Sequence, residues 1–414
     1  MLESLFDHFL PYDAERLWQR ACRRAGVSRS PEPEQMRAMT KLLRSYRDEA
    51  RLNAAGRLVA INDVRRLLTQ RLRMEQERAA NPAIAEQEIR APIFITGLPR
   101  TSTSLLHGLI ASNPRFRAPM TWEVMEPTPA PGLAGRATTR WRIAKAKLLL
   151  GFFDVLAPGF QAIHEVAAEV PQECIAMLAH SGLSLRFVVT YRVPGYVELL
   201  RQADMRSAYR WHRQFLQHLQ VGGEPRRWVL KAPAHLNDLA ALLAVYPDAT
   251  VIQTHRDPLD TLPSLASLRV TISRAFSIHV DAVEAGQEVL DWWADALRGS
   301  LAVREQYPDH FIDVDYRQLT ADPDAVLSDV YARLNEPFTE RDKARCRDYL
   351  AANPQGKHGQ HSYRAEDYGF EREMLERAFA DYRRERGFDR ASPRRSPDVP
   401  AHVPLAANAG ADAT

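Results

Sequence analysis

The sequence predicts an α/β fold in which a parallel sheet is flanked by helices. Short, almost continuously apolar runs, such as residues 92–97 and 250–255, are typical of strands buried on both faces of a parallel sheet. Each run leads into a polar loop and then into apolar residues at helical spacing. Strands and helices that alternate in this way favour a doubly wound sheet with right-handed crossovers.

The elements divide the chain into three segments. Residues 1–90 repeat apolar side chains at helical spacing, with a break over 28–34, and are expected to form a helical N-terminal extension. Residues 91–388 are expected to form the α/β domain. The last segment, 389–414, is rich in Pro, Ala, Ser and Arg and is predicted to be disordered. Four strands are expected, at residues 92–97, 228–231, 250–255 and 310–316.

Composition excludes several classes of protein. The 414 residues carry a formal net charge of +3, which indicates neither a nucleic-acid coat nor a polybasic membrane anchor. Three cysteines without a close pair argue against a disulfide framework and a zinc site, so we expect no metal. No signal peptide or bilayer-spanning stretch is apparent. These features predict a soluble, cytoplasmic protein.

The loop after the first predicted strand is a candidate anion site. Arg100 is followed by four consecutive hydroxyl residues, and a helix begins directly behind them; the hydroxyl residues are Thr101, Ser102, Thr103 and Ser104. A helix N-terminus offers free backbone N–H groups and a favourable dipole, hydroxyls donate to phosphoryl oxygens, and arginine adds a fixed positive charge. A plain N-cap would need only one of these hydroxyls.

A P-loop nucleotide triphosphatase is the obvious competing interpretation. Its motif G-x-x-x-x-G-K-[ST] needs a second glycine and a lysine that reaches the β- and γ-phosphates. This loop has Gly97 but neither of the other two, and it is shorter. Such a loop suits a ligand with one 5′-phosphate that carries another group.

The segment PIFITGLPRTSTSLLHGLIASNP resembles the 5′-phosphosulfate loop of sulfotransferases that use 3′-phosphoadenosine 5′-phosphosulfate (PAPS). The resemblance places Arg100 and the four hydroxyls around the phosphosulfate. Where many relatives have a tryptophan that stacks on adenine, this chain has Leu105. The segments APMTWEVMEP, PQEC, KAPAHL, THRDP and HSYRAEDYGF extend the resemblance to most of the chain and to the bacterial branch. It implies a P-loop-like sulfotransferase fold and PAPS as co-substrate.

The same resemblance assigns the nucleotide's 3′-phosphate to an arginine and a serine eight residues apart. Arg256 in THRDP and Ser264 in LPSLAS have that spacing. An ordinary helix-start ion pair of Arg256 with Asp257 or Asp260 is the alternative. Three further matches are implied: Lys231 beside the sulfo group, Tyr316 at the adenine, and a late basic loop over the 3′-phosphate, formed by Lys357, His358 and Gly359.

The general base that the acceptor hydroxyl requires is less evident. Many relatives use a histidine two residues after the lysine, but this chain has Pro233 there, and His235 follows two residues later. Other branches use a glutamate, and Glu123, 23 residues after Arg100, fits that spacing. Glu123 is the first expectation and His235 the second. A cluster from His164 to Glu173 is expected to line the acceptor side.

The resemblance therefore predicts an enzyme that moves a sulfo group from PAPS to a hydroxyl of a small-molecule or lipid acceptor. Arg100 and Lys231 would neutralise the departing phosphate during in-line transfer. A non-catalytic adenosine-bisphosphate-binding protein and a nucleotide or small-molecule kinase remain the alternatives. No nucleic-acid partner is expected, and the identity of the acceptor and the oligomeric state cannot be predicted from the sequence.

Overall fold

The computed structural model describes residues 11–156, 167–353 and 363–389. Within them, five parallel strands form one sheet in the order β2-β3-β1-β4-β5, which confirms the predicted fold class. Four strands lie where the sequence predicts them, and the short β2 is additional. The strands are β1 (Ile93–Gly97), β2 (Phe116–Arg117), β3 (Arg227–Lys231), β4 (Thr250–His255) and β5 (Phe311–Asp315).

The central strand β1 is buried along its whole length, which explains its continuous apolar sequence. Phe94 faces one hydrophobic core, while Ile93 and Ile95 face a second core on the other side of the sheet. The register pairs Ile95 with Lys231 of β3 and with Ile252 of β4. The carboxyl ends of these three strands therefore meet at one edge of the sheet, where ligands bind in open α/β folds.

Three helices form most of the N-terminal segment: α2 (Ala14–Ala25), α3 (Pro33–Asp48) and α4 (Ala54–Ala80). The predicted break over 28–34 separates the first two, and Pro33 opens α3, where a proline is well tolerated. Side chains of α3 and α4 share one core with helices from the middle of the chain. The division of the chain near residue 90 stays a prediction, and residues 390–414 of the expected tail lie outside the described ranges.

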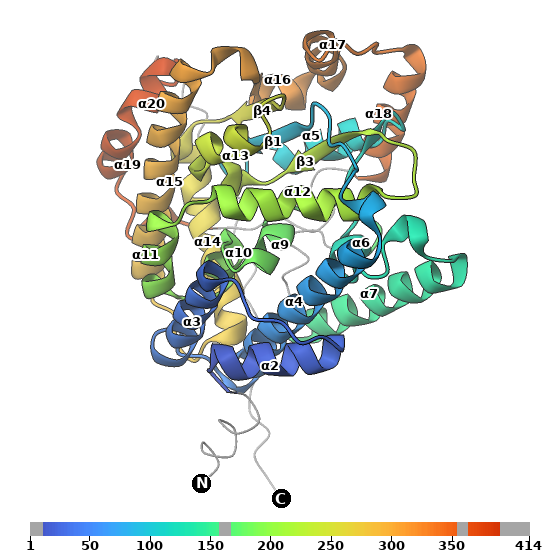
Figure 1. Ribbon diagram of the computed structural model, residues 1–414. Helices are drawn as coiled ribbons and strands as arrows, with labels where there is room; N and C mark the ends of the chain where they lie inside the picture. Colours follow the sequence, from blue (N-terminus) through green and yellow to red (C-terminus); the bar gives the residue numbers. More distant parts are fainter. Residues whose placement is uncertain (1–10, 157–166, 354–362, 390–414) are drawn as a thin grey trace, which may run out of the picture.

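Helices cover both faces of the sheet, and α12 crosses in front of it in Figure 1. The helices from β1 to β3 are α5 (Thr103–Ala111), α6 (Thr121–Met125), α7 (Arg136–Leu156), α9 (Cys174–Leu178), α10 (Leu185–Thr190), α11 (Pro194–Gln202) and α12 (Arg206–Gln220). The later ones are α13 (Leu239–Val245), α14 (Pro258–Phe276), α15 (Ala282–Gln306), α16 (Tyr316–Ala321), α17 (Pro323–Arg333), α18 (Glu340–Ala352), α19 (Arg372–Ala378) and α20 (Ala380–Glu385).

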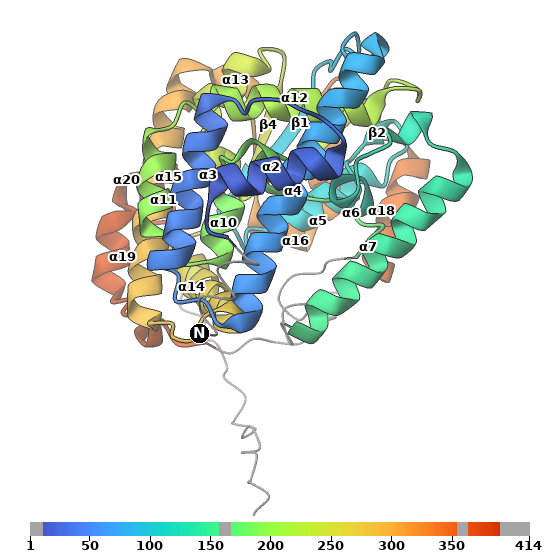
Figure 2. The same ribbon diagram turned by 60° about the horizontal axis from the view of Figure 1, so that its bottom comes forward.

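One helix stands apart from this packing. Both ribbon views place α7 at the periphery, and Figure 2 shows it projecting beside α4 and α6. Among the helices of the described ranges, none is long and apolar enough to cross a membrane.

Candidate active site

The loop between β1 and α5 has an unusual backbone. Arg100 and Ser102 both have left-handed conformations, with φ of 70° and 65°. Such conformations are uncommon for residues other than glycine, and they occur in the anion-binding concavities that successive backbone N–H groups form. The loop ends at Ser102, the N-cap of α5, so it delivers the free N–H groups of that helix.

The four hydroxyl residues of this loop divide into two groups. Thr101 is buried; its hydroxyl donates to the carbonyl oxygen of Leu98 at 2.6 Å and lies 2.6 Å from the hydroxyl oxygen of Thr254 on β4. Thr101 thus fixes the loop to the sheet. The side chains of Ser102, Thr103 and Ser104 instead line a cavity, where Arg100 joins them.

Lys231 reaches this loop from the end of β3. Its amino group donates to the hydroxyl of Ser104 at 3.1 Å and forms an ion pair with the carboxylate of Glu173, the N-cap residue of α9. Both side chains of the ion pair are largely buried. A cation and a carboxylate therefore stand together next to the hydroxyls of the loop.

Arg256 lies at the end of β4, on the opposite side of the loop. Its guanidinium donates to the carbonyl oxygen of Arg100 at 3.2 Å and lies 4.3 Å from the ring centroid of Tyr316, the first residue of α16. The alternative, a helix-start ion pair, is weak for Asp260, which is 4.0 Å from Arg256 and half-exposed. Arg256 is thus held at the loop by a backbone carbonyl and an aromatic ring.

The other residues that were predicted to bind the 3′-phosphate do not join Arg256 in the described part of the structure. Ser264 is half-buried on α14 and does not line the cavity, although its neighbour Leu265 does. Lys357, His358 and Gly359 lie outside the described residues, so their predicted role stays a prediction. Asp257, which follows Arg256, caps α14 and accepts three hydrogen bonds from the Arg383 guanidinium, so it has a structural function.

One cavity of about 760 Å³ connects the loop to a large apolar chamber. At the loop end it is lined by Arg100, Ser102, Ser104, Arg256 and Tyr316. The chamber behind Lys231 and Glu173 is lined mainly by aliphatic and aromatic side chains, which include Met125, Leu150, Ile175, Phe187, Leu268, Val289 and Trp293. A charged ligand group fits at one end, and a hydrophobic molecule fits in the chamber.

The chamber also contains a charged cluster that the sequence analysis did not anticipate. Asp63 of α4 accepts hydrogen bonds from Arg186 at 2.6 Å and from Arg66 at 3.0 Å. Burial on its own would raise the pKa of Asp63, but the two guanidinium groups outweigh it and hold the pKa below its ordinary value. This ion-paired cluster gives the otherwise apolar chamber a polar wall.

The structure does not bring Glu123 into the cavity. Its carboxylate accepts a hydrogen bond from Arg117 at 3.1 Å and another from the backbone N–H of Met120 at 2.9 Å. The second of these hydrogen bonds caps the N-terminus of α6. The Arg117 guanidinium in turn lies over the ring of Trp228. Both carboxylate oxygens are therefore engaged in holding α6, while the next residues, Val124 and Met125, line the cavity.

His235 is also placed away from the cavity. Its ring is fully buried, with Nδ1 2.7 Å from the hydroxyl oxygen of Tyr209 and the ring edge against Phe94. Burial lowers the pKa of His235 well below its ordinary value, and Lys231 acts in the same direction. The lining of the cavity near β3 comes instead from Pro233 and Ala234. Glu173, which the sequence analysis named only within a cluster, does line the cavity, as do the carboxylates of Asp63 and Glu288.

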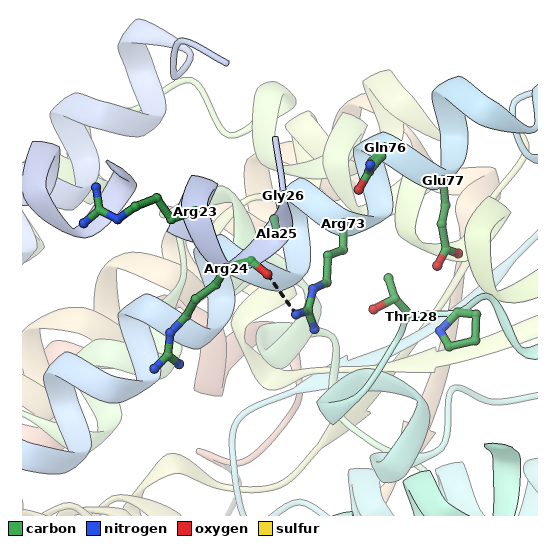
Figure 3. A pocket seen from close by; sticks show the side chains of 9 residues that line it. Arg23, Arg24, Ala25, Gly26, Arg73, Gln76, Glu77 and Thr128 are labelled. Atoms are coloured by element: carbon green, nitrogen blue, oxygen red, sulfur yellow. Dashed lines mark hydrogen bonds between the residues drawn. The ribbon is translucent and has the colours of Figure 1, made fainter. Parts of the chain in front are cut away.

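A second hollow lies on the outer surface between α2 and α4. It is lined by Arg23, Arg24 and Arg73 together with Thr128 and Pro129 (Figure 3). Arg73 donates to the backbone carbonyl of Arg24 there, and no residue of the loop after β1 takes part. This hollow is therefore separate from the candidate active site.

Among the described residues, no group of three or more His, Cys, Asp or Glu side chains is placed to hold a metal ion.

Comparison with known proteins identifies the chain. A family model described as "Sulfotransferase family" matches residues 92–340, which include the loop, Lys231 and Arg256. This chain is a member of the sulfotransferase family. The sulfotransferase therefore has the transferase activity that the resemblance implies, on the P-loop-like fold that was predicted.

Relatives of this sulfotransferase occur in mycobacteria. The structure of sulfotransferase STF1 from Mycobacterium tuberculosis H37Rv is 30% identical, covers 89% of this chain and 98% of its own, and superposes with a TM-score of 0.77. Sulfotransferase STF9 from Mycobacterium avium is 25% identical, covers 90% and 96%, and has a TM-score of 0.78. The omega-hydroxy-beta-dihydromenaquinone-9 sulfotransferase Stf3 of Mycobacterium bovis is 26% identical over 322 residues, which are 76% of this chain and 79% of that protein.

Proposed function

We propose that this sulfotransferase moves the sulfo group of PAPS onto a hydroxyl of a hydrophobic, lipid-like acceptor. The observation that carries the proposal is one cavity that joins the loop after β1 to the apolar chamber; Glu173 and Ser104 line it, and Lys231 contacts both of them, Glu173 through an ion pair. A nucleotide at the loop and an acceptor in the chamber would meet at that ion pair. The name of Stf3 supports this class of acceptor, since the menaquinone derivative in it is an isoprenoid lipid with a hydroxyl group.

The nucleotide end has the groups that PAPS requires. In this proposal Arg100, Ser102, Thr103, Ser104 and the N-terminus of α5 hold the 5′-phosphosulfate. Thr101 acts indirectly by fixing the loop. Arg256 and Ser264 take the 3′-phosphate together with Lys357, His358 and Gly359, and Tyr316 orders Arg256 and contacts the adenine.

The transfer itself would need little covalent chemistry from the protein. The bond between sulfur and the 5′-phosphate oxygen breaks, a bond from sulfur to the acceptor oxygen forms, and adenosine 3′,5′-bisphosphate leaves. Lys231 stabilises the charge that develops on the leaving oxygen and the sulfo group. The hydroxyl proton passes to a carboxylate, and we assign that function to Glu173 in place of Glu123 or His235, because Glu173 lines the cavity and pairs with Lys231, which contacts Ser104 of the loop.

The charged cluster of the chamber fits an acceptor with a polar group at some distance from its hydroxyl. Asp63 and Arg186 lie among the lining residues, and a buried ion pair can orient a carbonyl or phenol oxygen by hydrogen bonds.

We also propose that the enzyme works in the cytoplasm, since its three cysteines are buried free thiols, as is usual in a reducing compartment.

Turnover tests the proposal directly. The purified chain is incubated with PAPS labelled in the sulfo group and with a panel of long-chain alcohols, hydroxylated isoprenoid quinones and simple phenols. We expect label to move to the hydrophobic hydroxyl compounds, with release of adenosine 3′,5′-bisphosphate. Binding of that nucleotide without transfer to any acceptor would favour a non-catalytic nucleotide-binding protein. Consumption of ATP in its place would favour a kinase.

A further inference from the structure

Helix α7 exposes an apolar stripe on its outer face. Leu148 is 75% exposed, Trp141 60% and Phe152 59%, whereas most large hydrophobic side chains of the described residues are buried. Positions 141, 148 and 152 differ by seven and four residues and so lie on one face of the helix. Ala144, also exposed, lies between them on the same face. We call this face the apolar stripe of α7.

Basic side chains flank the apolar stripe, and acidic ones are absent from it. Arg140 and Lys147 lie on one side of the stripe and Lys145 lies at its other edge, while Arg136 is in the first turn of the helix, nearer the opposite face. Within Arg136–Phe152 there is no Asp or Glu. Lys145 and Lys147 pair with acidic residues of other segments. In the described part of the chain, Arg136 and Arg140 have no acidic partner.

The opposite face of α7 anchors the helix to the protein. Ile143, Ala146 and Leu150 pack with Trp122 of α6 in a small separate core. Arg142 is fully buried and donates to the backbone carbonyl of Pro129 at 2.7 Å. The helix is therefore held by one face while its apolar stripe projects outward, as Figure 2 shows for the helix as a whole.

The same helix borders the cavity. Leu149 and Leu150 of α7 line the apolar chamber, next to Met125 of α6. An apolar surface thus runs along α7 from the exposed stripe to the chamber that we assign to the acceptor.

We infer that α7 is an interfacial helix, which docks the protein on the surface of an anionic lipid bilayer with the apolar stripe inserted among the headgroups. An apolar face flanked by Arg and Lys is the pattern of helices that lie in the plane of a membrane interface. Arginine and lysine beside the stripe are attracted to anionic headgroups. Docking in this position would bring the part of the chamber that Leu149 and Leu150 line close to the lipid phase, from which a water-insoluble acceptor must come.

A second copy of the chain is the competing occupant of the stripe. A twofold dimer would place the same patch of each subunit against the other. The cations beside one stripe would then approach those of the partner; Lys145 and Lys147 are offset by Glu126 and Glu169, but Arg140 has no acidic partner among the described residues, so like charges would still repel. The charge of α7 therefore favours an anionic bilayer over a copy of the chain.

Vesicle binding by the full chain tests the inference. The protein is sedimented with vesicles of phosphatidylcholine alone or of phosphatidylcholine mixed with phosphatidylglycerol. We expect binding to the anionic vesicles that weakens with added salt. The double variant Leu148→Glu/Phe152→Glu should bind at least about tenfold more weakly, because both apolar side chains are removed from the inserted face.

A matched control uses the same kind of change elsewhere. Ile278, which follows α14, is also 75% exposed but is not part of α7. The variant Ile278→Glu should bind vesicles like the parent protein. Binding of adenosine 3′,5′-bisphosphate, measured by calorimetry, should be unchanged in all variants and reports that they are folded.

Two outcomes would overturn the inference. One is equal vesicle binding by the parent protein and the double variant. The other is a parent protein that does not bind anionic vesicles but is a dimer that the double variant dissociates, which would assign the stripe to a second copy. Neither outcome affects the proposed function, which is measured separately with PAPS and a detergent-solubilised acceptor.

Discussion

Lys231 and Glu173 form a largely buried ion pair beside Ser104 of the loop after β1, and Glu173 also lines the cavity. One residue ends β3 and the other caps α9, so segments 58 residues apart in the sequence meet at this point. In the proposed mechanism the pair supplies a fixed cation and an adjacent proton acceptor.

The first prediction concerns this carboxylate. Glu173→Gln keeps the shape of the side chain but removes its basicity, so kcat should fall by about two orders of magnitude or more. Affinity for adenosine 3′,5′-bisphosphate should change little. The matched control is Glu123→Gln, which should lower the free energy of unfolding because Glu123 pairs with Arg117 and caps α6, but should keep most of the turnover. The reverse order of the two kcat values would return the base to Glu123.

The second prediction concerns nucleotide selection by Arg256. Arg256→Ala should weaken binding of adenosine 3′,5′-bisphosphate by roughly ten- to a hundredfold, because a charged hydrogen-bonding group is lost. Affinity for adenosine 5′-phosphosulfate, which has no 3′-phosphate, should change much less. Calorimetry with both nucleotides measures the difference.

Asp260→Asn is the matched control for Arg256. If the long contact between Arg256 and Asp260 mattered for the fold, this variant would lose stability; we expect it to keep both its stability and its nucleotide affinity. A loss of affinity for the two nucleotides by the same factor in Arg256→Ala would show that Arg256 does not read the 3′-phosphate.

The third prediction concerns the start of the loop. Gly97 has a φ of 144°, and a Cβ atom there would lie 2.3 Å from the hydroxyl oxygen and 2.5 Å from the carbonyl oxygen of Thr254. Gly97→Ala must therefore push β1 and β4 apart and disturb the bond between Thr101 and Thr254. We expect a loss of about 2 kcal/mol or more in the free energy of unfolding, together with weaker nucleotide binding.

Gly135→Ala provides the comparison for that change, because a Cβ atom at Gly135 has nothing within 4 Å. Urea denaturation of both variants measures the difference. Equal stability of the two variants would mean that β1 and β4 can separate at no cost, which would contradict the close contact described here.

The strands and the loop could be predicted because their signals are local. A strand buried on both faces needs a continuous apolar run, and a loop that binds an anion needs hydroxyl and basic residues, so both appear in a short window of sequence. The strand β2 has only two residues, Phe116 and Arg117, and leaves no such run. Its place in the sheet depends on pairing with β3, more than a hundred residues later.

The candidate base shows where sequence spacing stops being informative. Glu123 has a spacing that fits a glutamate base, but that spacing does not reveal that Arg117 and the backbone of Met120 engage both of its oxygens. Glu173 lies in the PQEC segment and in the cluster that was expected on the acceptor side, but its position next to Lys231 arises only when α9 packs at the end of β3. Its place in the active site is a property of the tertiary structure.

The last prediction concerns stability in acid, through His107 on α5. Burial, with a smaller effect of the charge on Lys231, lowers the pKa of His107 from its ordinary 6.5 to about 3 in the folded protein. Its Nε2 lies 3.2 Å from the carbonyl oxygen of Val229, so the neutral ring donates there. Between these two pKa values the unfolded chain binds a proton that the folded protein does not, so stability falls as the pH drops below about 6.5.

For this one histidine the loss is roughly 2 kcal/mol at about pH 5. His107→Gln keeps an N–H donor for Val229 but cannot take up a proton. Urea denaturation at about pH 7.5 and about pH 5 should therefore show a smaller acid loss in the variant than in the parent protein. Part of the loss should remain, because His180 and His212 are buried with pKa values that burial lowers to about 3. An acid loss as large in the variant as in the parent would mean that His107 does not bind a proton on unfolding over this range, and that the instability arises at the other buried histidines.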